Sequence, residues 1–148
     1  YNQKCNRMEK IYKWCIMIEH KHIIIRALVN KPLKTEDEAK LWWNDLVKEI
    51  SMVKLDLPEN PICGYVDTPG NKGVTIVGII ETSHIAMHIW DEQTPALVQL
   101  DVYTCSSLPQ DKVHQMLDVM DPIQVDWETY DREHSLERID NGARNYGP

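Results

Sequence analysis

The sequence predicts an α+β protein, a two-layer sandwich in which an antiparallel sheet carries helices packed on one face. Three observations favour this class. Short β-branched runs follow one another between residues 53 and 104, with turn residues between them. Apolar residues recur at helical spacing near 36–51 and 108–122. The 148 residues, 43% hydrophobic and 26% charged, fit one globular unit, so a single domain is expected over 1–148.

The first elements are an expected strand region and a helix. Residues 16–29 are rich in isoleucine and valine, although the polar stretch 19–22 interrupts them. Thr35 and Glu38 then have the spacing of a capping box, which places a helix start just after Thr35. An apolar stripe at helical spacing extends the helix over about 36–51: Ala39, Trp42, Leu46 and Ile50.

A series of short strands is expected after this helix. Residues 53–57 and 62–66 are the first two, separated by a segment with proline at each end, and 67–73 has strong turn chemistry. Three further strands are predicted from β-branched or alternating runs, at 74–80, 85–90 and 96–104.

The last part of the chain is expected to hold one helix, one strand and a tail. Residues 108–122 have proline near each end and an apolar helical face of Val113, Met116, Leu117 and Met120. A strand is predicted at 123–127. The remainder, from about residue 131, is charged and is expected to be a mobile tail.

Charge and composition exclude several classes of partner. The 23 acidic and 16 basic residues give a net charge of −7, which repels a phosphate backbone, so no nucleic acid is expected as a partner. The longest apolar run, residues 23–25, is too short to span a bilayer, and no signal-peptide pattern is present. A cytoplasmic protein without a membrane partner is therefore expected. The four cysteines form no CxxC pair, so reduced thiols are expected.

The stretch ETSHIAMHIWDE, residues 81–92, places several polar side chains in a strand-like run. His84 and His88 are four residues apart, which in a strand is about 13 Å, too far to share one ion, so no metal site is expected. A hydrolase centred on Ser83 lacks the GxSxG elbow and an evident acidic partner. The remaining structural explanation is a polar hairpin tip at Ser83 and His84 with a surface His88.

The same stretch, followed by LDVYTC at 100–105, resembles the prokaryotic-type S-adenosylmethionine decarboxylases. Their pattern runs Glu-Ser-His-x-x-x-His-Thr-Trp-Pro-Glu and then Val-Asp-Val-Phe-Thr-Cys-Gly. The match is close over 73–105, and the order of elements agrees over about 20–130. The residues that depart from the pattern are most similar to those of short virus-encoded members. The resemblance implies a homodimer that decarboxylates S-adenosylmethionine, with a self-derived pyruvoyl group, to supply spermidine synthesis.

The resemblance also implies roles for individual residues. The Ser83 hydroxyl would attack the carbonyl of Thr82, so that the chain is cut between them and Ser83 becomes the pyruvoyl cofactor. His88 would be the base for this self-cleavage. Thr75 occupies the position of a serine that assists processing, and Cys105 that of the thiol that returns a proton to the substrate.

Two further residues are expected to bind substrate. One matches a family residue, and the other is a candidate replacement for a family residue that this chain lacks. Glu92 matches a glutamate whose carboxylate holds the ribose hydroxyls. The chain contains no phenylalanine, so it lacks the family's aromatic residue that stacks on adenine. Tyr65 is the candidate replacement. His84 also matches a family position and is given only a structural or site-lining role.

Alternatives remain at this point. The missing aromatic residue is compatible with a relative that decarboxylates ornithine or arginine by the same chemistry. A homologue that never cleaves itself and acts as a binding or regulatory protein is the other alternative. In a regular strand Ser83 and His88 also point to opposite faces and lie about 16 Å apart, so the mechanism requires a turn or bulge at Ser83, or another strand or subunit.

Overall fold

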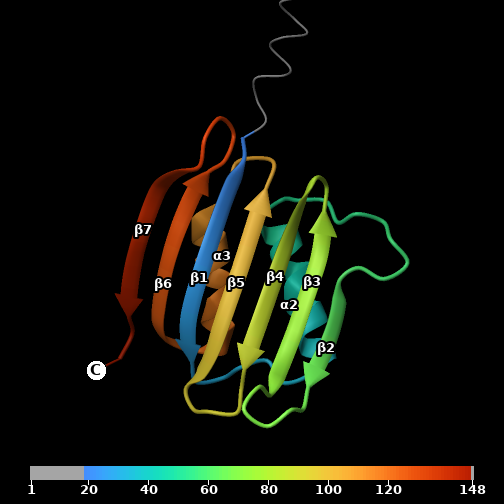
Figure 1. Ribbon diagram of the computed structural model, residues 1–148, viewed down its shortest axis with the longest axis vertical. Coiled ribbons are helices and arrows are strands. Elements are labelled where there is room, and N and C mark those ends of the chain that lie inside the picture. The colour runs from blue at the N-terminus through green and yellow to red at the C-terminus, as the bar shows by residue number, and fades with distance from the viewer. Residues whose placement is uncertain (1–18, 148) are drawn as a thin grey trace, which may run out of the picture.

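The computed structural model describes residues 19–147 and shows a seven-stranded sheet with two helices on one face (Figure 1). The strand order is β2-β3-β4-β5-β1-β6-β7, and every neighbouring pair is antiparallel. The predicted α+β sandwich is confirmed. The strands are β1 Lys21–Val29, β2 Ile62–Val66, β3 Gly73–Ile80, β4 Ser83–Trp90, β5 Ala96–Thr104, β6 Pro122–Asp131 and β7 Glu137–Asn145.

β1 lies inside the sheet although it comes first in the described chain. It pairs with β5 on one side and β6 on the other. Alternate residues, from Ile23 to Val29, are buried against the helices, while Ile24 and Arg26 lie on the opposite, open face. This alternation is what a strand covered on one face requires. The part of the predicted strand at 16–18 lies outside the described residues.

Helix α2, Glu36–Glu49, forms where its capping box was predicted. The Glu38 backbone N–H donates to the Thr35 hydroxyl at 3.2 Å, and the Thr35 N–H donates to the Glu38 carboxylate at 3.2 Å. Trp43 is fully buried beneath the sheet, and its indole N–H donates to the Ile85 carbonyl at 3.1 Å. Gly78 makes room for this ring, because a β-carbon there would lie 2.2 Å from a ring atom.

The second helical region is shorter than expected. Helix α3 spans Gln110–Leu117 and continues as a 3₁₀ turn, Asp118–Met120. Figure 1 shows α2 behind β3 and β4, and α3 behind β5, β1 and β6, so the two helices divide the covered face between them.

The predicted strand at 53–57 is wrong. Only an isolated bridge between Lys54 and Ile80 forms there. Val53 and Leu57 are exposed, so their apolar side chains face solvent rather than a core, and the proline at 58 limits further pairing.

The prediction of an unstructured tail beyond residue 131 is also wrong. Strand β6 runs on to Asp131, and β7 then pairs with it along the edge of the sheet. Nearly all β7 side chains are exposed, so the segment has none of the apolar alternation by which a strand is recognised. Backbone pairing forms β7, helped by Gly142, where an added β-carbon would lie 2.3 Å from the ring of Trp127.

Candidate active site

The turn that joins β3 to β4 is tight and strained. Ile80 and Ser83 are the last paired residues of the hairpin, so only Glu81 and Thr82 form the turn. Thr82 has φ 51°, in the left-handed region. This conformation is rare for a β-branched residue and costs about 1–3 kcal/mol. The strain therefore lies at the residue whose carbonyl the predicted self-cleavage would attack.

Ser83 and Cys105 meet at this turn. Ser83 begins β4 on the face covered by the helices and is 7% exposed. Its hydroxyl donates to the Glu81 carbonyl oxygen at 2.9 Å, and the Cys105 thiol donates to the same oxygen at 3.2 Å. Cys105 follows directly after β5, which ends beside the start of β4. The structure thus brings together two predicted site residues that are 22 positions apart.

His88 and Thr75 form a second pair, away from the turn. They lie opposite each other on β4 and β3, and the Thr75 hydroxyl oxygen is 3.1 Å from His88 Nδ1. Both side chains are on the open face, whereas Ser83 points towards the helices. His88 is five positions after Ser83 in β4, about 16 Å along the strand. Within one chain, the structure does not bring His88 to Ser83.

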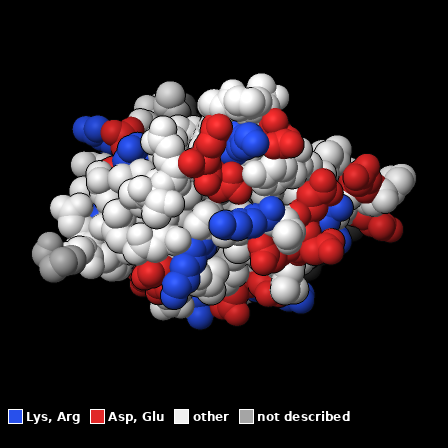
Figure 2. Space-filling model, turned by 90° about the horizontal axis from the view of Figure 1, so that it is seen from below, with Lys and Arg blue, Asp and Glu red and all other residues white. Residues whose placement is uncertain are grey.

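Glu92 and Tyr65 lie at the opposite end of the sheet from the strained turn. The Gly70 N–H donates to a Glu92 carboxylate oxygen at 2.7 Å, and the Tyr65 hydroxyl donates to Asp91 at 3.2 Å. That hydrogen bond, burial and the negative charge of Asp91 raise the pKa of Tyr65, with burial the largest cause. Figure 2 views this end and shows acidic side chains gathered on the side of β2 rather than that of β7.

A cavity of about 310 Å³ opens beside Glu92. Trp90 and Gly70 line it together with Arg26 from β1, and the Trp90 indole N–H donates to Asn71 at 2.7 Å. Sequence analysis overlooked Trp90 as a site residue, although it stands two positions before Glu92 and is aromatic. It also overlooked the Glu81 carbonyl, since no side-chain pattern marks a backbone acceptor.

Comparison with known proteins identifies the family of this chain. The family described as S-adenosylmethionine decarboxylase matches residues 21–133, which include all of β1 to β6. The chain belongs to this S-adenosylmethionine decarboxylase family. Its members are pyruvoyl-dependent enzymes that form the pyruvoyl group from their own chain.

One relative of this chain is an arginine decarboxylase proenzyme. The chain is 32% identical over 79 residues to an arginine decarboxylase proenzyme of Hyperthermus butylicus, which covers 48% of this chain and 51% of that protein. The chain thus spans about half the length of the curated relative it matches.

The residues at the turn fit a self-derived pyruvoyl group in this family member. Such a group needs a serine whose own peptide bond can be attacked, and Ser83 follows a strained peptide unit with its hydroxyl held close to that unit. In residues 19–147, no helix of this decarboxylase homologue is both long enough and apolar enough to cross a membrane.

Proposed function

We propose that this chain is a pyruvoyl-dependent decarboxylase that cleaves its own backbone between Thr82 and Ser83. The observation that carries the proposal is the shared acceptor at the turn, where the Ser83 hydroxyl and the Cys105 thiol both donate to the Glu81 carbonyl. A nucleophile and a proton donor therefore flank one strained peptide unit. Membership of the decarboxylase family supports the same activity.

Self-cleavage proceeds through an ester. Ser83 Oγ bonds to the Thr82 carbonyl carbon, and the Thr82–Ser83 amide C–N bond breaks. A base removes the Ser83 Cα proton, the Cβ–Oγ bond breaks, and Thr82 leaves as a carboxylate. The dehydroalanine left at position 83 takes up water and releases ammonia, which yields a pyruvoyl group. Breaking the chain here also releases the strain of Thr82, about 1–3 kcal/mol.

A pyruvoyl group at position 83 would supply an electron sink for decarboxylation, because its carbonyl can condense with a substrate amine and take up the electrons released with carbon dioxide. Cys105 is placed to return a proton, because its thiol already lies at the Ser83 turn. Glu92, with Tyr65 and Trp90 nearby, is the proposed binding group for the rest of the substrate. Because Glu92 lies at the opposite end of the sheet from Ser83 within one chain, we assign this role to Glu92 of a second copy. Its carboxylate can accept two hydroxyl donors or pair with a cation.

We assign Thr75 and His88 to the Ser83 turn of a second copy in a homodimer. Their separation from Ser83 within one chain supports this arrangement, and so does the character of the open face that carries them. That face exposes the apolar side chains of Ile24, Val77 and Ile79 around polar neighbours, as a protein contact surface does. His88, oriented by Thr75, then serves as the base for the Ser83 Cα proton.

Intact-mass measurement tests the cleavage itself. We expect two fragments, residues 1–82 and 83–148, the second carrying a pyruvoyl group in place of Ser83 and losing carbonyl reactivity on borohydride treatment. The Ser83→Ala variant should give a single full-length species. A single full-length species from the unaltered chain would instead favour a non-cleaving homologue that acts by binding.

A mixing experiment tests the shared site. Neither Ser83→Ala nor His88→Ala chains should cleave alone. When the two variants are unfolded, mixed and refolded together, mixed dimers combine an intact Ser83 with an intact His88 from the other chain. Cleavage of the His88→Ala chain in the mixture supports the proposal. No cleavage in confirmed mixed dimers would contradict the assignment of His88 to the second copy.

S-adenosylmethionine is the proposed substrate, giving the aminopropyl donor for spermidine synthesis. Arginine is the second candidate, because the relative from Hyperthermus butylicus is an arginine decarboxylase proenzyme. Both substrates are cationic, which suits the acidic side chains at the Glu92 end (Figure 2). Carbon dioxide release from each substrate, with ornithine as a third, separates them. No release from S-adenosylmethionine together with release from arginine would overturn the first choice.

A further inference from the structure

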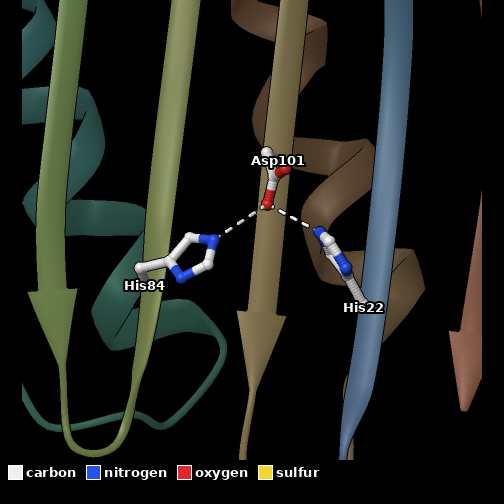
Figure 3. A group of neighbouring side chains, drawn as sticks. All are labelled: His22, His84 and Asp101. Atoms are coloured by element: carbon white, nitrogen blue, oxygen red, sulfur yellow. Dashed lines mark hydrogen bonds and ion pairs between the residues drawn. The ribbon is translucent and has the colours of Figure 1, made fainter. Parts of the chain in front are cut away.

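Three polar side chains from three neighbouring strands converge on the open face of the sheet (Figure 3). His22 on β1 and His84 on β4 both lie opposite Tyr103 of β5. Asp101 is two residues before Tyr103 and therefore shares its face. Asp101 Oδ1 is 2.7 Å from His22 Nε2 and 3.2 Å from His84 Nε2, and the three atoms lie within 4.8 Å of one another.

We propose that His22, His84 and Asp101 form a binding site for a divalent transition-metal ion of the zinc or cobalt type. Two imidazole nitrogens and one carboxylate oxygen are a ligand set that such ions favour, and water can complete the coordination. In the single chain the side chains of His84 and Asp101 are 43% and 39% exposed, so an ion can reach them from solvent before two copies associate through the open face. The proposal does not depend on self-cleavage or decarboxylation.

The surroundings of the three side chains keep them in place. The Tyr103 ring packs between the two imidazoles, with its centroid 5.8 Å from that of His22 and 5.6 Å from that of His84. Partial burial raises the pKa of Asp101, but the hydrogen bonds and charges of His22 and His84 outweigh it and leave that pKa below its usual value. The carboxylate is therefore ionised at neutral pH and available to a cation.

One neighbour opposes metal binding and provides a sharp test. Arg132 lies over the Tyr103 ring, and its guanidinium is 3.3 Å from His22 Nδ1. Because arginine only donates, His22 accepts at Nδ1 and carries its proton on Nε2, which donates to Asp101. An ion at Nε2 requires that proton to move to Nδ1, so Arg132 must turn away. Removing the guanidinium should therefore tighten binding.

Metal binding at this position would fasten three strands together at the end of the sheet that holds the self-cleavage turn. His84 directly follows Ser83, and β5 leads from Asp101 to Cys105. An ion that binds the folded chain and not the unfolded chain raises stability in proportion to the logarithm of its concentration above the dissociation constant. The expected result is a metal-dependent rise in the melting temperature.

The test is a cobalt titration of the full chain, purified without a polyhistidine tag and followed by visible absorption and thermal melting. We expect one Co²⁺ per chain and competition by Zn²⁺. His22→Gln and His84→Gln should each weaken binding by at least about tenfold, since even an outer-shell change costs about 10- to 100-fold. Arg132→Gln should tighten it. His134→Gln is the matched control, because that side chain is 88% exposed and lies beside Glu133 rather than in the three-residue cluster.

Two results would overturn the proposal. One is the absence of Co²⁺ binding to the folded chain. The other is an affinity for Co²⁺ that neither histidine substitution changes. A sulfur-to-cobalt absorption band in that case would assign the ion to cysteine. If either histidine variant fails to fold by circular dichroism, Asp101→Asn decides, since it keeps the side-chain shape and removes the charge. The titration is repeated on Ser83→Ala protein, which cannot cleave itself, so its outcome is separate from that of the proposed function.

Discussion

The two faces of the sheet differ in what their side chains do. On the covered face, Ile85 and Met87 of β4 are fully buried against the helices. On the open face of the same strand, His84 and His88 have polar partners and partial exposure. Ser83 is the exception, because it is the proposed reactive side chain and lies on the covered face. Strand alternation thus places the side chains that stabilise the fold on one face and most of the proposed catalytic side chains on the other. In the proposed reaction, a second chain brings its His88 to Ser83.

The pair Ile79 and Ile80 offers the largest test of this separation. The residues are adjacent in β3, but Ile79 is 44% exposed on the open face and Ile80 is fully buried. Ile80→Ala should lower the free energy of unfolding by about 2–5 kcal/mol, because it leaves a cavity among the helices. Ile79→Ala, its matched control, should cost less than about 1 kcal/mol. Urea denaturation measures both, and equal losses would mean that the open face contributes to the fold as the covered face does.

His88→Ala should show the opposite profile. Loss of a general base is expected to slow self-cleavage by at least about 100-fold, which corresponds to about 2.7 kcal/mol in the activation barrier. Stability should change by no more than about 1 kcal/mol, since within residues 19–147 the imidazole gives up a single side-chain hydrogen bond, the one to Thr75. Cleavage is followed by gel electrophoresis over time, with Thr75→Val as the companion variant that disturbs only the orientation of the imidazole. A normal rate in His88→Ala would remove His88 from the mechanism.

Gly78 tests how tightly the covered face is packed. A β-carbon at this position would meet the Trp43 ring at 2.2 Å, so Gly78→Ala should cost about 1–3 kcal/mol through overpacking. Gly64, in β2, has no atom within 4 Å of an added β-carbon, and Gly64→Ala should be close to neutral. Chemical denaturation of the two variants measures the difference, and a neutral Gly78→Ala would show that Trp43 can shift without cost.

His114 gives the smallest effect, and it depends on pH. The residue is buried on the helix side with its ring against Trp127, and its Nδ1 has no hydrogen-bond partner within the described residues. Burial, followed by the positive charge of Arg144, lowers the pKa of His114 below 6.5. The unfolded chain therefore binds the proton more readily. The stabilising contribution is fully present above pH 6.5 and is lost as the pH falls through the folded-state pKa.

His114→Leu should remove this dependence. As the pH falls from 7.5 to 5, the difference in melting temperature between the two proteins is expected to change in favour of the variant, because only the unaltered chain loses the contribution of His114. A constant difference across the range would show that His114 does not titrate in this interval.

Sequence reasoning predicted the elements whose local signals agree with their tertiary surroundings. Thr35 and Glu38 marked the start of α2 correctly, because a capping box needs only residues of its own turn. β7 could not be recognised, because its side chains face solvent and only its pairing with β6 makes it a strand. The segment 53–57 misled for the opposite reason: its apolar residues are present, but its pairing with the end of β3 stops at Val53 and Leu55 and forms only one bridge.

The residues of the candidate site remain predictions from the sequence, and their geometry could not be predicted from it. The conflict between Ser83 and His88 followed from strand alternation alone and is present in the structure. The pairing of Thr75 with His88 depends on the hairpin register, and the contact of Ser83 with Cys105 depends on where β5 ends. The polar stretch 19–22 had no explanation from sequence, and the structure supplies one, since His22 pairs with Asp101 and Lys21 with Asp131.

Strand β7 also limits which other strands can add to the edge of the sheet. β7 presents the outer edge, where unpaired backbone groups invite a strand from another molecule. Its side chains are charged or polar at most positions, including Glu137, Arg138 and Asp140, and they are almost all exposed. A foreign strand would have to bury these charges to add to the edge. β7 thus closes one border of the sheet against uncontrolled growth into aggregates, while leaving the open face available for specific association.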